Sequence, residues 1–165
     1  MAREGCPSGL ATAKPRRERW ALEELWDIVV EADPDGSVEE TPYRGVYLLY
    51  AGPWRLARIA SRSTPAFVKS LVVTSRCLRI PSGVENLRVL LEGACLGSLH
   101  LRGNSKILLR LLEETGIHRN RSTCRGNTGF IEGVDDIVLV ALGEARHCGY
   151  CCRLIIDTGL LGSSP

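Results

Sequence analysis

The arginines near the middle of the chain are the residues whose types and spacing best suit a chemical role. Guanidinium groups offer planar donors to phosphate oxygens and stack on exposed bases. These residues lie at the end of a short predicted strand, in the predicted helix that comes next and in the loop after that helix. The start of the helix adds backbone N–H donors for anions. The arrangement predicts an RNA-contacting cluster made of Arg102, Asn104, Lys106, Arg110, Arg119, Arg121 and Arg125.

Charge is segregated along the sequence, although the net charge is only +2. Residues 21–43 contain eight acidic side chains and no basic one, whereas residues 44–88 contain eight basic side chains and one acidic one. Segregation of this kind favours a polyanion-binding face, because neutralising phosphates releases counterions. A solvated surface is the alternative interpretation, since blocks of sequence need not share one face.

Seven cysteines without a secretion signal are typical of buried thiols or of a metal site. Residues 148–152 contain one Cys-x-x-Cys spacing beside His147, but a structural zinc site needs four ligands and a second such pair is absent. Alternation along a strand explains the spacing without ligands. We therefore expect free, structurally passive thiols, no metal ligands and no cofactor, with a disulfide such as Cys124–Cys148 as the alternative.

Signatures of catalysis are missing from the sequence. It has no dinucleotide-binding fingerprint, no phosphate loop and no nucleophile elbow. Asp135 and Asp136 are adjacent, and adjacent strand residues point to opposite faces, so they suit a surface turn better than an acid–base pair. We expect no catalytic residue and no enzyme activity. The alternatives are a protein–protein scaffold that docks a partner on its acidic helix, or a small redox or metal-dependent enzyme using Cys124, His147, Cys148 and Cys151.

The first half of the chain is organised around one amphipathic helix. Leu22, Leu25, Trp26 and Val29 fall on one helical face, and acidic residues take the opposite side. We expect a weak strand at residues 10–13 before this helix. After it we expect a strand pair within residues 38–50, a second helix from residue 53 and one long strand at residues 67–79. The order β-α-β-β-α-β predicts a ferredoxin-like unit.

The second half reads as a separate α/β unit that begins after Pro81. A capping-box pattern at residues 82–85 predicts a third helix. A strand at residues 99–102 then enters a fourth helix whose predicted buried side is Ile107, Leu108, Leu111 and Leu112. Residues 118–129 are predicted to be a loop, and the last strands are expected at residues 137–142 and 150–156.

Residues 10–50 resemble the N-terminal part of the THUMP-containing tRNA acetylation adaptors. In that family a strand ending in threonine, an acidic helix and a Thr-x-Tyr-x-Gly-aliphatic strand occur in this order. The matching positions are Thr12, Thr41, Tyr43, Gly45 and Val46. Downstream, a helix, a strand ending in a basic residue, a second helix and two strands are similar to a THUMP core, so the resemblance covers roughly residues 9–157.

The resemblance and the element order together imply an α+β fold in two domains. Residues 1–80 form the ferredoxin-like domain, residues 81–158 a compact THUMP-like RNA-binding domain, and residues 159–165 a flexible tail. What the family likeness implies for function is tRNA binding without chemistry, in support of a separate tRNA-modifying enzyme such as a cytidine acetyltransferase. No apolar run reaches the length of a membrane helix, so we expect a cytoplasmic protein without a membrane partner.

Overall fold

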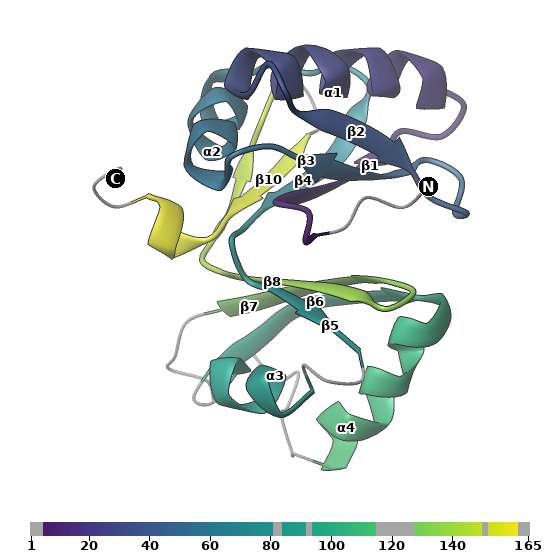
Figure 1. Ribbon diagram of the computed structural model, residues 1–165, viewed down its shortest axis with the longest axis vertical. Helices are drawn as coiled ribbons and strands as arrows, with labels where there is room; N and C mark the ends of the chain where they lie inside the picture. The colour runs from purple at the N-terminus through teal and green to yellow at the C-terminus, as the bar shows by residue number, and fades with distance from the viewer. Residues whose placement is uncertain (1–4, 81–83, 92–93, 115–127, 150–151, 162–165) are drawn as a thin grey trace.

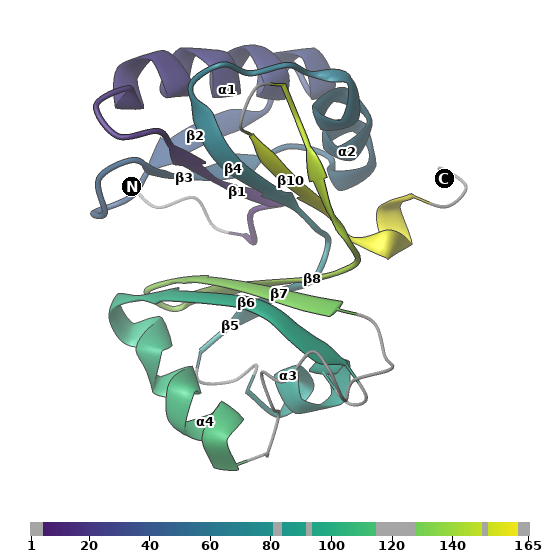
Figure 2. The same ribbon diagram turned by 180° about the vertical axis from the view of Figure 1, so that it is seen from behind.

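Two β-sheets lie face to face, and helices cover the outer face of each (Figures 1 and 2). The computed structural model describes residues 5–80, 84–91, 94–114, 128–149 and 152–161. Helices and sheets both contribute, and the expected α+β fold class is confirmed.

The first sheet has the strand order β2-β3-β1-β4-β10-β9. Its strands are β1 (Gly9–Ala13), β2 (Ser37–Glu40), β3 (Val46–Tyr50), β4 (Val68–Val73), β9 (Ala145–His147) and β10 (Arg153–Ile156). β1, which we expected to be weak, is central and pairs antiparallel with both β3 and β4. Both of its neighbours are apolar strands, and their hydrogen bonds compensate for the low strand propensity of its alanines.

The second sheet has the order β5-β8-β7-β6. Its strands are β5 (Cys77–Arg79), β6 (Cys95–Arg102), β7 (Thr128–Val134) and β8 (Ile137–Leu142). The sequence analysis missed β7, because Gly129 and Gly133 weaken its strand pattern. β7 nevertheless pairs on both sides, parallel to β6 and antiparallel to β8.

Helices α1 (Glu18–Ala32) and α2 (Pro53–Arg62) pack on the outer face of the first sheet. The predicted burial of Leu25 and Val29 in α1 is confirmed. The prediction for Trp26 is wrong, because this side chain is 38% exposed and Ile28 takes the inward place. The buried stripe of the helix runs through Ala21, Leu25, Ile28, Val29 and Ala32, and Trp26 lies outside it.

Helices α3 (Val84–Leu91) and α4 (Leu108–Glu114) cover the second sheet, and the 3₁₀ helix η1 (Gly103–Ile107) leads into α4. Leu108 and Leu112 are buried as predicted, whereas Ile107 is 56% exposed. A 3₁₀ helix advances three residues per turn rather than 3.6. Ile107 belongs to that tighter turn, and it therefore leaves the buried face that an uninterrupted α-helix would give it.

Apolar side chains fill the space between the two sheets. Leu10, Leu48 and Tyr50 of the first sheet pack with Val134 and Leu139 of the second. A second group in the same layer consists of Val72, Phe130, Ala141 and Ile155. The inner faces of both sheets are therefore sealed over most of their area, and any site between them must lie at an edge of this layer.

Both sheets take strands from the two halves of the chain. Residues 67–79 were predicted to be one strand, but they form β4 and β5 in different sheets. Between them Thr74 is buried, and its hydroxyl donates to the Val140 carbonyl over 2.7 Å. β5 precedes the predicted domain boundary yet pairs with β8, and β10 follows it yet pairs parallel with β4. Each sheet therefore contains strands from both sides of residue 80. The division of the chain into two domains at that residue stays a prediction.

From β1 to β4 the elements occur in the expected β-α-β-β-α-β order, and β10 and β9 extend this sheet beyond four strands. Near the C-terminus, the 3₁₀ helix η2 (Thr158–Leu160) buries Leu160 against the core of the first sheet. Regular structure therefore continues into the start of the predicted tail. Among the described residues, no helix has the length and apolar character needed to span a membrane.

Candidate nucleic-acid interface

A polar row crosses the first sheet at one end of the layer between the sheets. Side chains two residues apart on a strand share a face. Leu10, Val72 and Ile155 contribute to the apolar layer. Two residues away on the same strands lie Thr12, Ser70 and Arg153, which are aligned across β1, β4 and β10. The hydroxyls of Thr12 and Ser70 are 2.5 Å apart, so the inner face of the sheet becomes polar here.

The second sheet places a buried carboxylate on its inner face. Glu132 lies two residues from the inward-packed Phe130 on β7 and is only 4% exposed. One carboxylate oxygen, Oε1, is 2.8 Å from His100 Nδ1, and the other accepts a hydrogen bond of 3.0 Å from Arg102 Nη1. Both partners come from β6, the edge strand that pairs in parallel with β7. Pairing of this kind offsets the cost of burying a charge.

Between these two polar surfaces lies a hollow of about 470 Å³. The first sheet and its connecting turn contribute Arg44, Lys69 and Arg153 to its lining, and the second sheet contributes His100, Arg102 and Glu132. Four permanent cations face one carboxylate. The formal charge of the lining is therefore +3 even with the histidine neutral. We call this the cationic hollow.

The cations of the first sheet remain accessible to a ligand. Lys69 is exposed and has no ion-pair partner within the described parts of the chain. Arg153 lies over the Phe130 ring at 5.2 Å from its centroid. Arg44 Nε is 3.0 Å from Glu18 Oε1, but the arginine side chain is 82% exposed. A solvent-exposed ion pair contributes little to stability. Arg44 can therefore leave Glu18 and bind a phosphate group.

A tight turn positions Arg102 at the end of β6. The buried Ser105 hydroxyl accepts from the Arg102 backbone N–H at 2.9 Å and donates to the Arg102 carbonyl at 2.8 Å. Gly103 adopts a φ of 64°, and a Cβ at this position would overlap the Tyr43 hydroxyl and the Asp135 carboxylate. Glycine fits here because it adopts the left-handed backbone conformation without strain and has no side chain to overlap these groups.

Tyr43 and Asp135 also connect the two sheets. The Tyr43 hydroxyl donates a 2.6 Å hydrogen bond to Asp135 Oδ1, from the turn before β3 to the turn between β7 and β8. This hydrogen bond is the main reason that the pKa of Tyr43 lies above its usual value. Asp135 and Asp136 therefore occupy a surface turn, as predicted. Asp136 makes an ion pair with Arg79.

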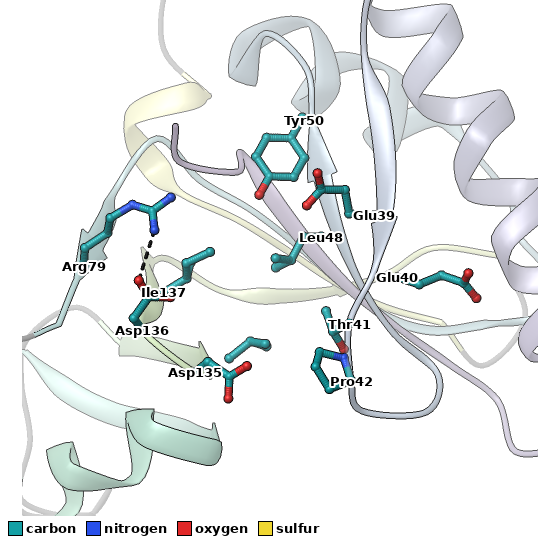
Figure 3. Close-up of a pocket in the computed structure, with 11 residues that line it drawn as sticks. Glu39, Glu40, Thr41, Pro42, Leu48, Tyr50, Arg79, Asp135, Asp136 and Ile137 are labelled. Atoms are coloured by element: carbon teal, nitrogen blue, oxygen red, sulfur yellow. Dashed lines mark hydrogen bonds and ion pairs between the residues drawn. The ribbon is translucent and has the colours of Figure 1, made fainter. Parts of the chain in front are cut away.

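A second hollow, of about 560 Å³, has the opposite electrostatic character (Figure 3). Its acidic lining residues are Glu39, Glu40, Asp135 and Asp136. The Arg79 guanidinium reaches Asp136 across 3.1 Å. Phosphates would be repelled by this surface, so the cationic hollow is the better candidate for a polyanion.

Among the cluster members that the structure describes, Arg102 lines the cationic hollow. Asn104 and Lys106 are exposed on η1, and Arg110 is exposed on α4. Arg119, Arg121 and Arg125 lie outside the described residues. The prediction did not include Lys69, His100, Glu132 or Arg153. A usable signal was present, since Thr12, Ser70 and Arg153 interrupt otherwise apolar inward positions of their strands.

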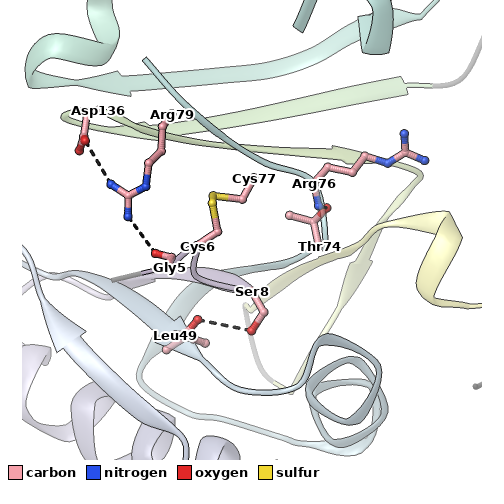
Figure 4. The surroundings of a disulfide bond; sticks show 9 residues. All are labelled: Gly5, Cys6, Ser8, Leu49, Thr74, Arg76, Cys77, Arg79 and Asp136. Atoms are coloured by element: carbon pink, nitrogen blue, oxygen red, sulfur yellow. Dashed lines mark hydrogen bonds and ion pairs between the residues drawn. A yellow bond between two sulfur atoms is a disulfide. The ribbon is translucent and has the colours of Figure 1, made fainter. Parts of the chain in front are cut away.

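Described cysteines are joined in disulfides rather than free. Cys6 pairs with Cys77, with their Cα atoms 5.8 Å apart (Figure 4). Cys148 pairs with Cys152, which corrects both the expected free thiol at Cys148 and the alternative Cys124–Cys148 bridge. Alternation along a strand misled the sequence analysis, because Cys148 follows the end of β9 and Cys152 precedes the start of β10, so neither cysteine belongs to a strand. Within the described residues, no group of three or more potential ligands could hold a metal ion.

Comparison with known proteins yields no relative: no family model matches the chain, and neither a curated protein nor a solved structure is significantly similar to it.

Proposed function

We propose that the protein binds RNA, and tRNA in particular, through the cationic hollow. It presents the RNA to a separate modifying enzyme and has no catalytic activity of its own. The observation that carries the proposal is the convergence of Arg44, Lys69, Arg102 and Arg153 on one hollow, where a single buried carboxylate opposes them. These residues come from segments that are far apart in sequence, so it is the fold that brings them together.

An extended polyanion explains the arrangement better than a small anion. One phosphate would need two or three donors, whereas this lining distributes its cations over both sheets. Lys106 and Arg110 are exposed on the elements that follow Arg102 and add two cations to the same chain segment. RNA-binding proteins commonly combine such backbone contacts with stacking on aromatic or guanidinium planes, and Arg153, held over Phe130, offers such a plane.

The choice of tRNA and of a modifying enzyme as partner rests on the resemblance to the THUMP-containing adaptors. The charge of the hollow supports RNA binding in general. A cytidine acetyltransferase is the partner that the resemblance implies, and it remains part of the proposal.

Salt-dependent binding tests the proposal. The logarithm of the tRNA association constant should fall linearly with the logarithm of salt concentration, by about 0.7–0.9 per phosphate neutralised. Replacing Arg44, Lys69 and Arg153 by alanine should weaken binding and reduce this slope by about two to three.

A matched control removes the same charge elsewhere. Arg55, Arg58 and Arg88 are exposed on the outer helices α2 and α3, so their triple alanine variant should keep a slope close to that of the wild type. Equal losses in the two triple variants would show that only net charge matters. The proposal of a binding site in the hollow would then be wrong.

A further inference from the structure

We propose that RNA binding in the cationic hollow is coupled to proton uptake by His100, which contacts phosphate in its charged form. This inference rests on the proposed function and adds its regulation by pH. It follows from the way in which a buried carboxylate holds the imidazole ring at the edge of a site for anions.

The contact with Glu132 fixes the role of one ring nitrogen. An ionised carboxylate only accepts hydrogen bonds. Nδ1, at 2.8 Å from Oε1, must therefore carry the proton in this contact. In a neutral ring the other nitrogen, Nε2, is then an acceptor and cannot bond a phosphate oxygen. Protonation turns Nε2 into a donor while the bond to Glu132 is kept.

Access and rigidity both suit this role. The His100 side chain is 51% exposed, whereas Glu132 is buried and also held by Arg102. The carboxylate is therefore a fixed support, and the ring projects from it at the lining of the hollow. Imidazole in general changes charge between about pH 5 and 8, and this range determines the pH values of the test below.

The charges around His100 determine the direction of the coupling. Within β6 its neighbour is Arg102, and from β7 it faces Glu132; the first sheet contributes Arg44, Lys69 and Arg153 to the same hollow. Bound phosphates neutralise the cations and add negative charge. Binding therefore favours the charged imidazole, and by linkage low pH favours binding.

The test is a set of tRNA titrations between pH 5.5 and 8.5 at one salt concentration. Wild-type affinity should fall by about tenfold between pH 6 and pH 8 if one proton is taken up with a midpoint in that range. H100Q should bind with the weaker affinity at every pH and lose this dependence, since glutamine can still donate to Glu132 but cannot become charged. Calorimetry near pH 7 in buffers of different ionisation enthalpy should count about half a proton taken up by the wild type, the average that a tenfold change over two pH units requires, and none by H100Q.

His147 supplies a control for the assignment. It is exposed on β9 and paired with Arg153 of β10, so it is a second histidine near the basic surface. H147Q should keep the pH dependence of the wild type. Loss of the dependence in H147Q but not in H100Q would overturn the inference, as would pH-independent wild-type binding. Failure to bind tRNA at any pH would overturn the proposed function as well, so the two failures are distinguishable.

Discussion

Glu132 links the stability of the second sheet to the chemistry of the cationic hollow. Its two oxygens hold His100 and Arg102 in fixed positions, so one carboxylate orients two of the side chains that we expect to meet phosphate. A negative charge is unfavourable in a site for anions unless it performs such a task. We expect Glu132 to lower the affinity of the hollow for anions while it holds His100 and Arg102 in defined positions.

Replacing Glu132 by alanine should lower the free energy of unfolding by about 2 kcal/mol. Breaking a fully buried ion pair costs about 3–5 kcal/mol, and the smaller figure allows for the partial exposure of both partners. Urea denaturation measures the change. H100A is the control and should cost less, because Arg102 still neutralises the carboxylate. A loss below about 0.5 kcal/mol in E132A would mean that the pair adds nothing to stability.

The turn from β6 into η1 is the element on which the position of Arg102 depends. Ser105 closes it by bonding both backbone groups of Arg102, and Gly103 fits beneath the Tyr43–Asp135 contact. The turn therefore couples the end of one strand to the hydrogen bond that joins the two sheets. A change in this turn would affect the hollow even though no cationic side chain is altered.

Replacing Gly103 by alanine should destabilise the protein by about 2 kcal/mol. A non-glycine residue in the left-handed region costs of the order of 1–3 kcal/mol, and the added methyl group would also displace Tyr43 and Asp135. Thermal unfolding measures the effect. G52A is the matched control, because Gly52 has a φ of −59° and an added Cβ would meet no atom within 4 Å. Similar losses in G103A and G52A would contradict the geometric argument.

At the scale of the whole molecule, the Cys6–Cys77 disulfide fastens the segment before β1 to β5 of the other sheet (Figure 4). Beside it, Arg79 Nη2 donates to the Gly5 carbonyl at 2.9 Å while Nη1 of the same side chain pairs with Asp136. These contacts reinforce the apolar layer between the sheets. The two walls of the hollow belong to different sheets, so we expect contacts that join the sheets to help preserve it.

Replacing Cys6 and Cys77 together by serine should lower the free energy of unfolding by about 2–4 kcal/mol. The bridge joins residues 71 positions apart, and closing a loop of that size removes about 4 kcal/mol of entropy from the unfolded chain in the chain-entropy model. Denaturation of both proteins under oxidising conditions measures the difference. Added reductant should lower the free energy of unfolding of the wild type toward that of the variant. If the two proteins are equally stable before reduction, the bridge is dispensable.

Local pattern was sufficient wherever a signal lay within one element. The face of α1 that carries Leu25 and Val29, the start of α2 at Pro53 and the apolar strands β3 and β8 all follow from the spacing of residues a few positions apart. Periodicity of this kind reflects burial on one side of a single element. The α+β class follows from the succession of these elements.

Only the tertiary structure decided which strands share a sheet and therefore which charges share a site. β7 has a weak pattern of its own and is stabilised by pairing with β6 and β8. β10 reaches β4 from the far end of the chain and brings Arg153 beside Ser70. Pairing between distant strands depends on packing that no short window of sequence records. The sequence by itself determined a basic chain segment around Arg102; the fold determined that Lys69, His100 and Arg153 join it around a buried Glu132.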